Sequence, residues 1–214
     1  MPQPARRSVA ALSLGAALLA ASVVGTAAPR PAAAGGGSEA VEIGLAAAAL
    51  FAGAAALEIW TDRTVLGNGG RTATTDAVIG AGVYGLEDDE LGTDRAGLGR
   101  VELRFKQEFW RVRPFIGIEG TTDASFYGYG GLMMDLWFTD NIVVSPNAAV
   151  GLYHEGDGRD LGHPVEFRTG IEAGWGFDNG WRLTAAVHHL SNASLSDENP
   201  GIETATVNLS IPLN

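Results

Sequence analysis

The chain has 214 residues, no cysteine, and 25 acidic against 14 basic residues, which gives a formal net charge of −11. This acidic balance argues against a nucleic-acid partner, because phosphate binding needs a basic surface. The absence of cysteine excludes disulfides and thiolate chemistry, and the length suffices for one domain.

Residues Met1 to Ala34 have the pattern of a secretory signal peptide. Arg6 and Arg7 form its positive region, an Ala/Leu-rich core follows, and three small residues ending at Ala34 form the expected cleavage site. The arginine pair also leaves a twin-arginine route open. Cleavage after Ala34 removes three arginines and no acids, so the mature chain carries 25 acidic and 11 basic residues and a formal charge of −14.

Residues 35–75 form an N-terminal extension whose structure the sequence leaves open. The apolar run Ile43 to Leu57 is shorter than the roughly 20 residues that a membrane-spanning helix needs. A short packed helix, an unusual first strand and a remnant of the targeting region are the alternatives. Gly67 to Thr75 is rich in Gly, Thr and Asn and has the composition of a linker.

From Asp76 onward, short segments that alternate apolar and polar residues recur between turn signals, which predicts β-strands. Asp178-Asn179-Gly180 is typical of a hairpin turn, because Asn-Gly readily adopts positive φ. We expect eight strands, at residues 77–86, 101–106, 112–119, 126–138, 142–153, 165–175, 181–190 and 202–213.

The class of this all-β fold depends on which face of the strands is inside. In a soluble sandwich or lipocalin-like barrel, the apolar face points to the core; in a membrane barrel it faces lipid and the charges pair in the lumen. The signal peptide, the even strand number and aromatic residues near strand ends favour the second. We therefore predict that residues 76–214 form an eight-stranded antiparallel transmembrane β-barrel, with these charged residues in the lumen: Glu102, Arg104, Glu166, Arg168 and Glu172.

The last two predicted strands place three reactive side chains on their apolar faces. His189 and Ser191 share one face with Leu183, and Glu203 shares the corresponding face of the next strand. A serine with a nearby base and an acid to orient that base is the arrangement of nucleophilic acyl transfer. The alternative is a polar girdle at the water interface without chemistry. His188 points to the other face, where a lumenal hydrogen bond is expected.

An acyl-transfer site also needs donors for the oxyanion of the tetrahedral intermediate. Asn192, Asn199 and the backbone N–H groups of the turn that ends at Gly201 are the candidates for oxyanion binding or positioning. Asn, Pro and Gly are also ordinary turn formers, so these residues have a purely structural alternative.

We predict that the protein binds no cofactor and no metal, because the other polar clusters have ordinary structural interpretations. A Gly-rich loop carries four residues of metal-binding type, but such side chains in loops are usually solvated: His154, Asp157, Asp160 and His163. The acidic run at 88–90 is interpreted in the same way. Gly80 to Gly85 matches a dinucleotide-binding string, yet no helical pattern follows it, so we interpret it as small residues in a curved strand.

Two motifs in the last quarter resemble a known family. H-L-S-N-A at His189 to Ala193 and N-P-G-I-E at Asn199 to Glu203 are similar to the catalytic segment of the PagL-type lipid A 3-O-deacylases, outer-membrane β-barrels with a His/Ser/Glu triad. His189, Ser191 and Glu203 fall on the family's triad, with spacings of two and then twelve residues. The similarity extends over residues 101–213, including V-R-P-F-I-G from Val112 and F-T-D-N from Phe138.

This resemblance implies an ester hydrolase that removes the 3-hydroxyacyl chain from the 3 position of lipid A, with lipopolysaccharide as the substrate and the outer membrane as its location. It implies no cofactor or metal. A triad on the outer wall would receive the acyl chain from within the membrane leaflet. The sequence leaves a homodimer open, together with two other functions: a non-enzymatic barrel for adhesion or envelope structure, and a soluble lipocalin-like binder.

Overall fold

The computed structural model describes residues 65, 67, 71–86 and 95–213. The predicted signal peptide, most of residues 35–75 and the acidic run at 88–90 lie outside this part. Among the described residues, no helix is long and apolar enough to cross a membrane.

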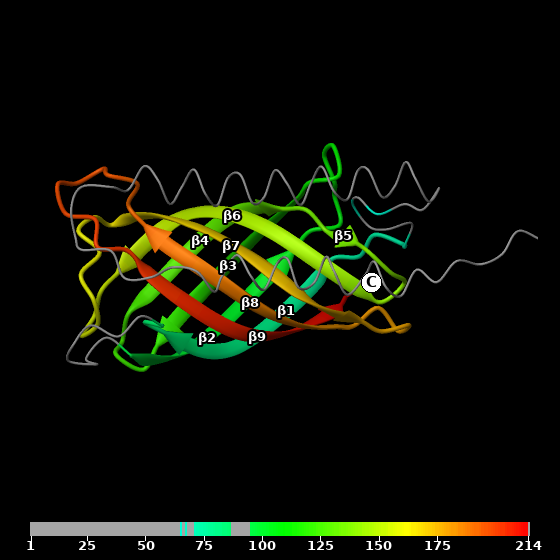
Figure 1. Ribbon diagram of the computed structural model, residues 1–214, viewed down its shortest axis with the longest axis horizontal. Coiled ribbons are helices and arrows are strands. Elements are labelled where there is room, and N and C mark those ends of the chain that lie inside the picture. Colours follow the sequence, from blue (N-terminus) through cyan, green and yellow to red (C-terminus); the bar gives the residue numbers. More distant parts are fainter. Residues whose placement is uncertain (1–64, 66, 68–70, 87–94, 214) are drawn as a thin grey trace, which may run out of the picture. The chain divides into compact units, whose positions relative to one another are not determined.

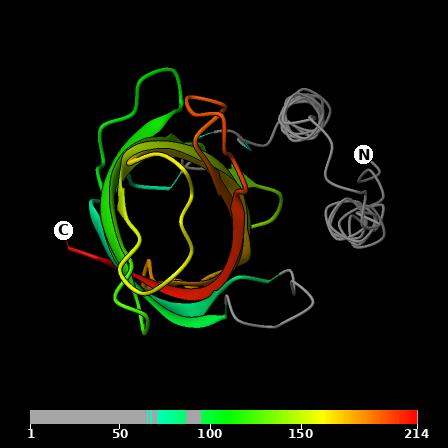
Figure 2. The same cartoon turned by 90° about the vertical axis from the view of Figure 1, so that its left-hand side faces the viewer.

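A single antiparallel sheet closes on itself to form an eight-stranded barrel (Figures 1 and 2). The segments are β1 (Asp76–Tyr84), β2 (Ala96–Arg104), β3 (Arg113–Thr121), β4 (Phe126–Met133), β5 (Leu136–Trp137), β6 (Ile142–His154), β7 (Val165–Gly176), β8 (Arg182–Ser191) and β9 (Ile202–Pro212). Consecutive segments pair with each other except β4 and β5, β1 pairs with β9, and the β4–β6 pairing completes the ring.

Eight predicted strands therefore become nine segments, because one of them is interrupted. Both β4 and the two-residue β5 pair with β6, so β5 continues β4 beyond a break at Met134 and Asp135. The break turns the Asp135 carboxylate inward, where it meets Arg182 at 2.6 Å and Arg113 at 3.3 Å. The prediction of β2 was wrong at both ends: the strand begins at Ala96 and stops at Arg104.

The outer wall of the barrel is apolar and the inside is charged. Large apolar side chains in the middle of the strands are about half exposed, among them Val101, Ile118 and Val207. Six charged side chains lie buried inside and form a continuous ion-pair network: Arg100, Glu102, Arg104, Glu119, Arg168 and Glu172. This distribution is that of a transmembrane barrel, in which lipid takes the place of the apolar core of a soluble sandwich.

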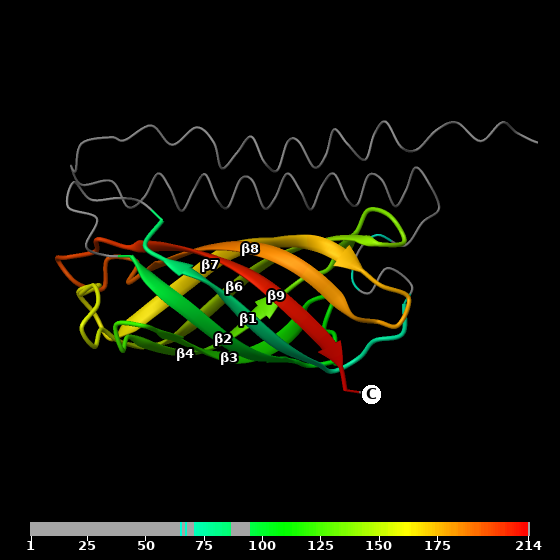
Figure 3. The same ribbon diagram turned by 90° about the horizontal axis from the view of Figure 1, so that it is seen from below.

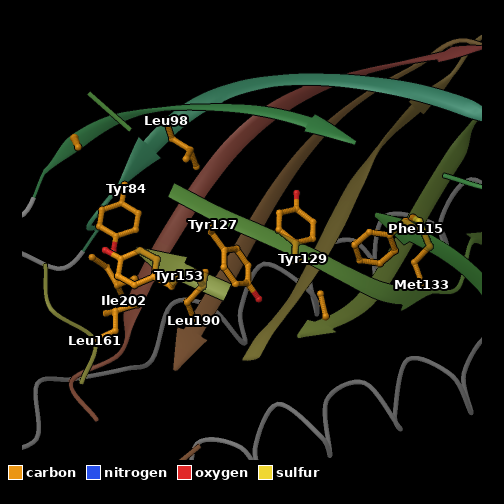
Figure 4. Packing of buried hydrophobic residues seen from close by; sticks show 12 residues of the cluster. Tyr84, Leu98, Phe115, Tyr127, Tyr129, Met133, Tyr153, Leu161, Leu190 and Ile202 are labelled. Atoms are coloured by element: carbon orange, nitrogen blue, oxygen red, sulfur yellow. The ribbon is translucent and has the colours of Figure 1, made fainter. Parts of the chain in front are cut away.

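Buried apolar side chains form a cluster inside the barrel (Figure 4). Leu161, from the loop between β6 and β7, packs with Leu190 and Ile202, and each of the three is at most 2 % exposed. The hydroxyls of Tyr84 and Tyr153 are 2.7 Å apart beside them. Ion pairs and apolar packing together occupy most of the lumen, and a pocket lined in part by Arg113, Asp135 and Arg182 lies towards the end of the barrel that carries the β7–β8 turn.

The two ends of the barrel differ in their connections. Among the described residues, the loops at one end span 122–125, 155–164 and 192–201; those at the other span 105–112, 138–141 and 177–181 (Figure 3). At this second end Trp137 is only 3 % exposed, and the guanidinium groups of Arg71 and Arg182 lie 4.2 and 5.4 Å from the centre of its ring. The aromatic side chains near the strand ends therefore differ in their facing: Trp137 is buried, whereas Trp175 and Trp181 are exposed.

Candidate active site

The alternation of β8 and β9 places the predicted triad on the outer wall. Inward positions on β8 are buried, from Arg182 through His188 to Leu190, while His189 and Ser191 are half-buried on the outward face. Glu203 lies on the outward face of β9, directly across the ladder from His189. The site occupies the end of the barrel with the longer loops.

A short hydrogen bond joins His189 to Glu203. The imidazole Nδ1 lies 2.8 Å from the carboxylate Oε1, and the two side chains are 25 % and 36 % exposed. Because an ionised carboxylate only accepts hydrogen bonds, this contact places the imidazole proton on Nδ1. Nε2 then carries the lone pair that a general base needs.

Ser191 lies two residues after His189 on the same face of β8, at the end of the strand. A strand rises about 3.3 Å per residue, so the two Cα atoms are about 7 Å apart along β8. Within the described part of the chain, the Ser191 hydroxyl makes no hydrogen bond. The structure thus brings His189 and Glu203 into contact and places Ser191 near them without a hydrogen bond to His189. Hydrogen bonds between a nucleophile and its base are often long in the absence of substrate.

Gly201 forms one wall of this site. Its φ is +61°, and a Cβ built on it would lie 2.8 Å from Cε1 and 3.3 Å from Nε2 of His189. The ladder between β8 and β9, continued by one step, sets Gly201 opposite Ser191. Glycine is therefore required here both by the backbone conformation and by the close approach of the imidazole.

The two candidate asparagines bind one another and the loops. The backbone N–H of Asn192 donates to Asn199 Oδ1 at 2.9 Å. The Asn192 amide donates to the carbonyls of Leu161 at 2.8 Å and Glu198 at 2.7 Å. Since these contacts occupy all three N–H hydrogens of Asn192, they fit a positioning role better than oxyanion binding, whereas the Asn199 amide makes no hydrogen bond with the described residues.

The loop after Ser191 contains a feature that the sequence does not reveal. Ala193 and Ser194 have φ values of +53° and +64°, in the left-handed region that residues with a Cβ rarely adopt. The turn is closed by the Leu195 N–H, which donates to the Asn192 carbonyl at 3.1 Å. Strained backbone of this kind is common near functional sites, but no turn signal in A-S-L-S predicts it.

The remaining sequence candidates lie away from the triad. His188 points inward, and its Nδ1 lies 3.1 Å from Arg100 Nη2, which confirms the predicted lumenal hydrogen bond. In the loop at 155–164, His163 Nδ1 accepts from the Val165 N–H, and Asp160 accepts from the Gly162 N–H. No group of three or more His, Cys, Asp or Glu side chains in the described residues is placed to hold a metal ion.

Comparisons with known proteins find a family and several similar folds. Residues 99–212 match the family model described as lipid A 3-O-deacylase (PagL). The crystal structure of the outer membrane enzyme PagL is similar in fold, with 21% sequence identity, a TM-score of 0.50, and coverage of 64% of this chain and 99% of that one. A de novo designed transmembrane β-barrel matches with 8% identity and a TM-score of 0.47, covering 66% of this chain and 98% of the design.

The outer membrane protein Ail of Yersinia pestis matches with 10% identity and a TM-score of 0.40, covering 64% of this chain and 99% of Ail. No protein with a curated description matches the sequence. The family match covers more than half of the chain, and the barrel with its apolar outer wall is that of an outer-membrane protein. The chain belongs to the PagL family of lipid A 3-O-deacylases.

Proposed function

We propose that this protein is an outer-membrane esterase that removes the ester-linked 3-hydroxyacyl chain from the 3 position of lipid A. The observation that carries the proposal is the His189–Glu203 hydrogen bond on the outward face of the barrel, with Ser191 beside it. Membership of the deacylase family supports the same reaction and substrate.

In the proposed reaction, Ser191 is the nucleophile. Its Oγ attacks the ester carbonyl while His189 Nε2 takes the hydroxyl proton, and Glu203 stabilises the imidazolium that forms. Collapse of the tetrahedral intermediate breaks the bond to the sugar oxygen, which receives the proton from His189. Water, deprotonated by the same imidazole, then releases the fatty acid from the acyl-serine, so no cofactor or metal takes part in a step.

The oxyanion needs donors close to Ser191. The Asn199 amide and the backbone N–H of Gly201 are the groups that fit, since Asn199 is held against Asn192 and Gly201 follows in the same turn. Asn192 contributes by holding the turn in place through its three hydrogen bonds.

The substrate reaches the site from the membrane. Ion pairs and apolar side chains occupy the lumen, whereas the outer wall that carries the triad exposes apolar side chains to lipid, with Phe167 beside Ser191 and Leu183 and Val207 farther along the strands. Outer-membrane barrels place their longer loops outside the cell, so the triad lies at the level of the outer leaflet, where lipid A resides. Acyl chains can then lie along the wall while the ester meets Ser191.

The test is mass spectrometry of lipid A from cells that express the intact protein, Ser191→Ala, or Ser194→Ala as a control in the same loop. We expect loss of one hydroxyacyl group with the intact protein and with Ser194→Ala, and at least a ~10³-fold slower loss with Ser191→Ala. Equal amounts of folded protein in the membrane are required for the comparison. Unchanged lipid A in all three strains would instead favour a non-enzymatic barrel.

A further inference from the structure

A buried carboxyl group lies behind the catalytic wall. Glu166, near the start of β7, points into the barrel and is 0% exposed. Neither of its carboxyl oxygens has a hydrogen-bond partner among the described residues. Its backbone carbonyl accepts from the Tyr127 hydroxyl at 3.0 Å, which fixes this part of the strand from inside.

The β7–β8 ladder places Glu166 next to the active-site loop. The last pair of that ladder is Phe167 with Ser191, so the register continued by one residue sets Glu166 opposite Asn192. Asn192 is also 0% exposed, and its Oδ1 likewise has no partner within the described structure. Two buried acceptor groups therefore lie across the ladder from each other without a donor.

Such a pair is unfavourable unless a hydrogen lies between the two groups, because a buried polar group without a partner loses its solvation. The nearest cation on the same strand is Arg168, whose guanidinium bonds to Glu119 at 2.6 Å and Glu102 at 3.1 Å. Because none of the described cations bonds to the Glu166 carboxyl, its neutral form is the favourable one, and this form can donate one hydrogen. A single buried water could carry that hydrogen bond onward.

We propose that Glu166 is a positioning residue for the deacylation, which donates a hydrogen bond to Asn192 Oδ1 either directly or through one water. This hydrogen bond affects the site through Asn192, because the Asn192 amide binds the carbonyls of Leu161 and Glu198 and Asn192 directly follows Ser191 in the chain. The Glu166 carboxyl thus holds the end of β8 and the loops at 155–164 and 192–201 in place. It does so from inside the barrel, whereas the substrate binds on the outer wall. This inference rests on the proposed function only for its effect on catalysis.

The experiment compares the intact protein with Glu166→Gln, Glu166→Leu and Thr204→Val, each purified in full and assayed on lipopolysaccharide in detergent micelles. Glutamine keeps a donor at position 166, and leucine keeps a similar volume without one. Thr204→Val is the matched control, since Thr204 Oγ1 is also buried inside this end of the barrel without a partner. Hydrogen exchange of residues 155–164 and 192–201 is measured on the same samples.

We expect Glu166→Leu to lower kcat about tenfold with little change in KM, and to accelerate amide exchange in both loops. Glu166→Gln should retain kcat within about twofold and wild-type exchange, as should Thr204→Val. Wild-type kcat and exchange in Glu166→Leu would overturn the proposal. So would a loss in Glu166→Gln as large as that in Glu166→Leu, because the charge rather than the donor would then matter.

Two further outcomes can be distinguished from those above. If Glu166→Leu does not fold, Glu166→Gln decides alone, and a kcat below half of the intact protein's value overturns the proposal. If the intact protein releases no fatty acid, the proposed function fails, while the exchange of the two loops still shows whether Glu166 holds Asn192.

Discussion

At the scale of single residues, the proposed site includes a glycine in close contact with one of its reactive groups. Gly201 combines a left-handed backbone with direct contact to the His189 ring, so a single methyl group would both strain the turn and displace the imidazole. In the proposed reaction, either effect would move His189 Nε2 relative to Ser191, and misplacement of a catalytic group by about 1 Å can lower a rate 10²-fold.

We therefore expect Gly201→Ala to lower kcat for deacylation by at least ~10-fold, as measured by fatty-acid release from lipopolysaccharide. Gly180→Ala is the matched control, because Gly180 also has positive φ, at +87°, but lies in the β7–β8 turn at the other end of the barrel. It should lose about 1 kcal/mol of stability and keep its activity. Equal activities of the two variants would contradict the role given to Gly201.

At the scale of elements, the turns set where the strands end, and the sequence reveals only some of these turns. The β7–β8 turn forms at the predicted Asp-Asn-Gly, whereas β2 and β3 are joined by a hairpin with Trp110 and Arg111 at its tip, whose φ values are +53° and +68°. Phe109 and Val112 exchange backbone hydrogen bonds of 2.8 and 3.0 Å around them. Asn-Gly is the usual choice for such a turn, so Trp and Arg gave no signal of it.

This hairpin leads to a stability prediction. Arg111→Gly removes the Cβ that disfavours a left-handed conformation and should raise the free energy of unfolding by about 1 kcal/mol. Arg111→Ala removes the guanidinium but keeps the Cβ, so it should show no such gain. Urea unfolding of the purified barrel in detergent measures both, and equal effects of Gly and Ala would show that the backbone conformation is not the cause.

At the scale of the whole molecule, the barrel is stabilised by lipid outside and by ion pairs and apolar packing inside. Ile118 lies near the middle of β3 with 49% of its surface exposed, on the face that meets the bilayer. An arginine there would lie in hydrocarbon, where outer-membrane barrels lose about 2–4 kcal/mol.

Ile118→Arg should accordingly lower the free energy of folding into phospholipid vesicles by about 2–4 kcal/mol. Leu195→Arg, in the loop at 192–201, changes an equally exposed apolar residue outside the strands and should cost little. Folding is followed by the mobility of unheated samples in SDS gels. A soluble barrel would tolerate both substitutions alike, so a small and equal effect would argue against the membrane assignment.

The sequence alone determined the period-two alternation, and with it the strand positions and the faces of most side chains. His189, Ser191 and Glu203 could be placed on one surface in this way, because alternation and spacing are local properties of the chain. The alternation does not, however, show which face points outward, because the same pattern fits both a soluble and a membrane barrel. Closure of the sheet decided between them, since it buried Arg168 and Glu102 together and left Val101 and Ile118 outside.

Only the tertiary structure could show which side chains meet. The 2.8 Å contact of His189 with Glu203 depends on the register between β8 and β9, which the loop at 192–201 sets through Asn192 and Asn199. The position of Glu166 behind that loop depends in turn on β7, more than twenty residues earlier in the chain. Such contacts join residues far apart in sequence, and no local pattern encodes the distance between them.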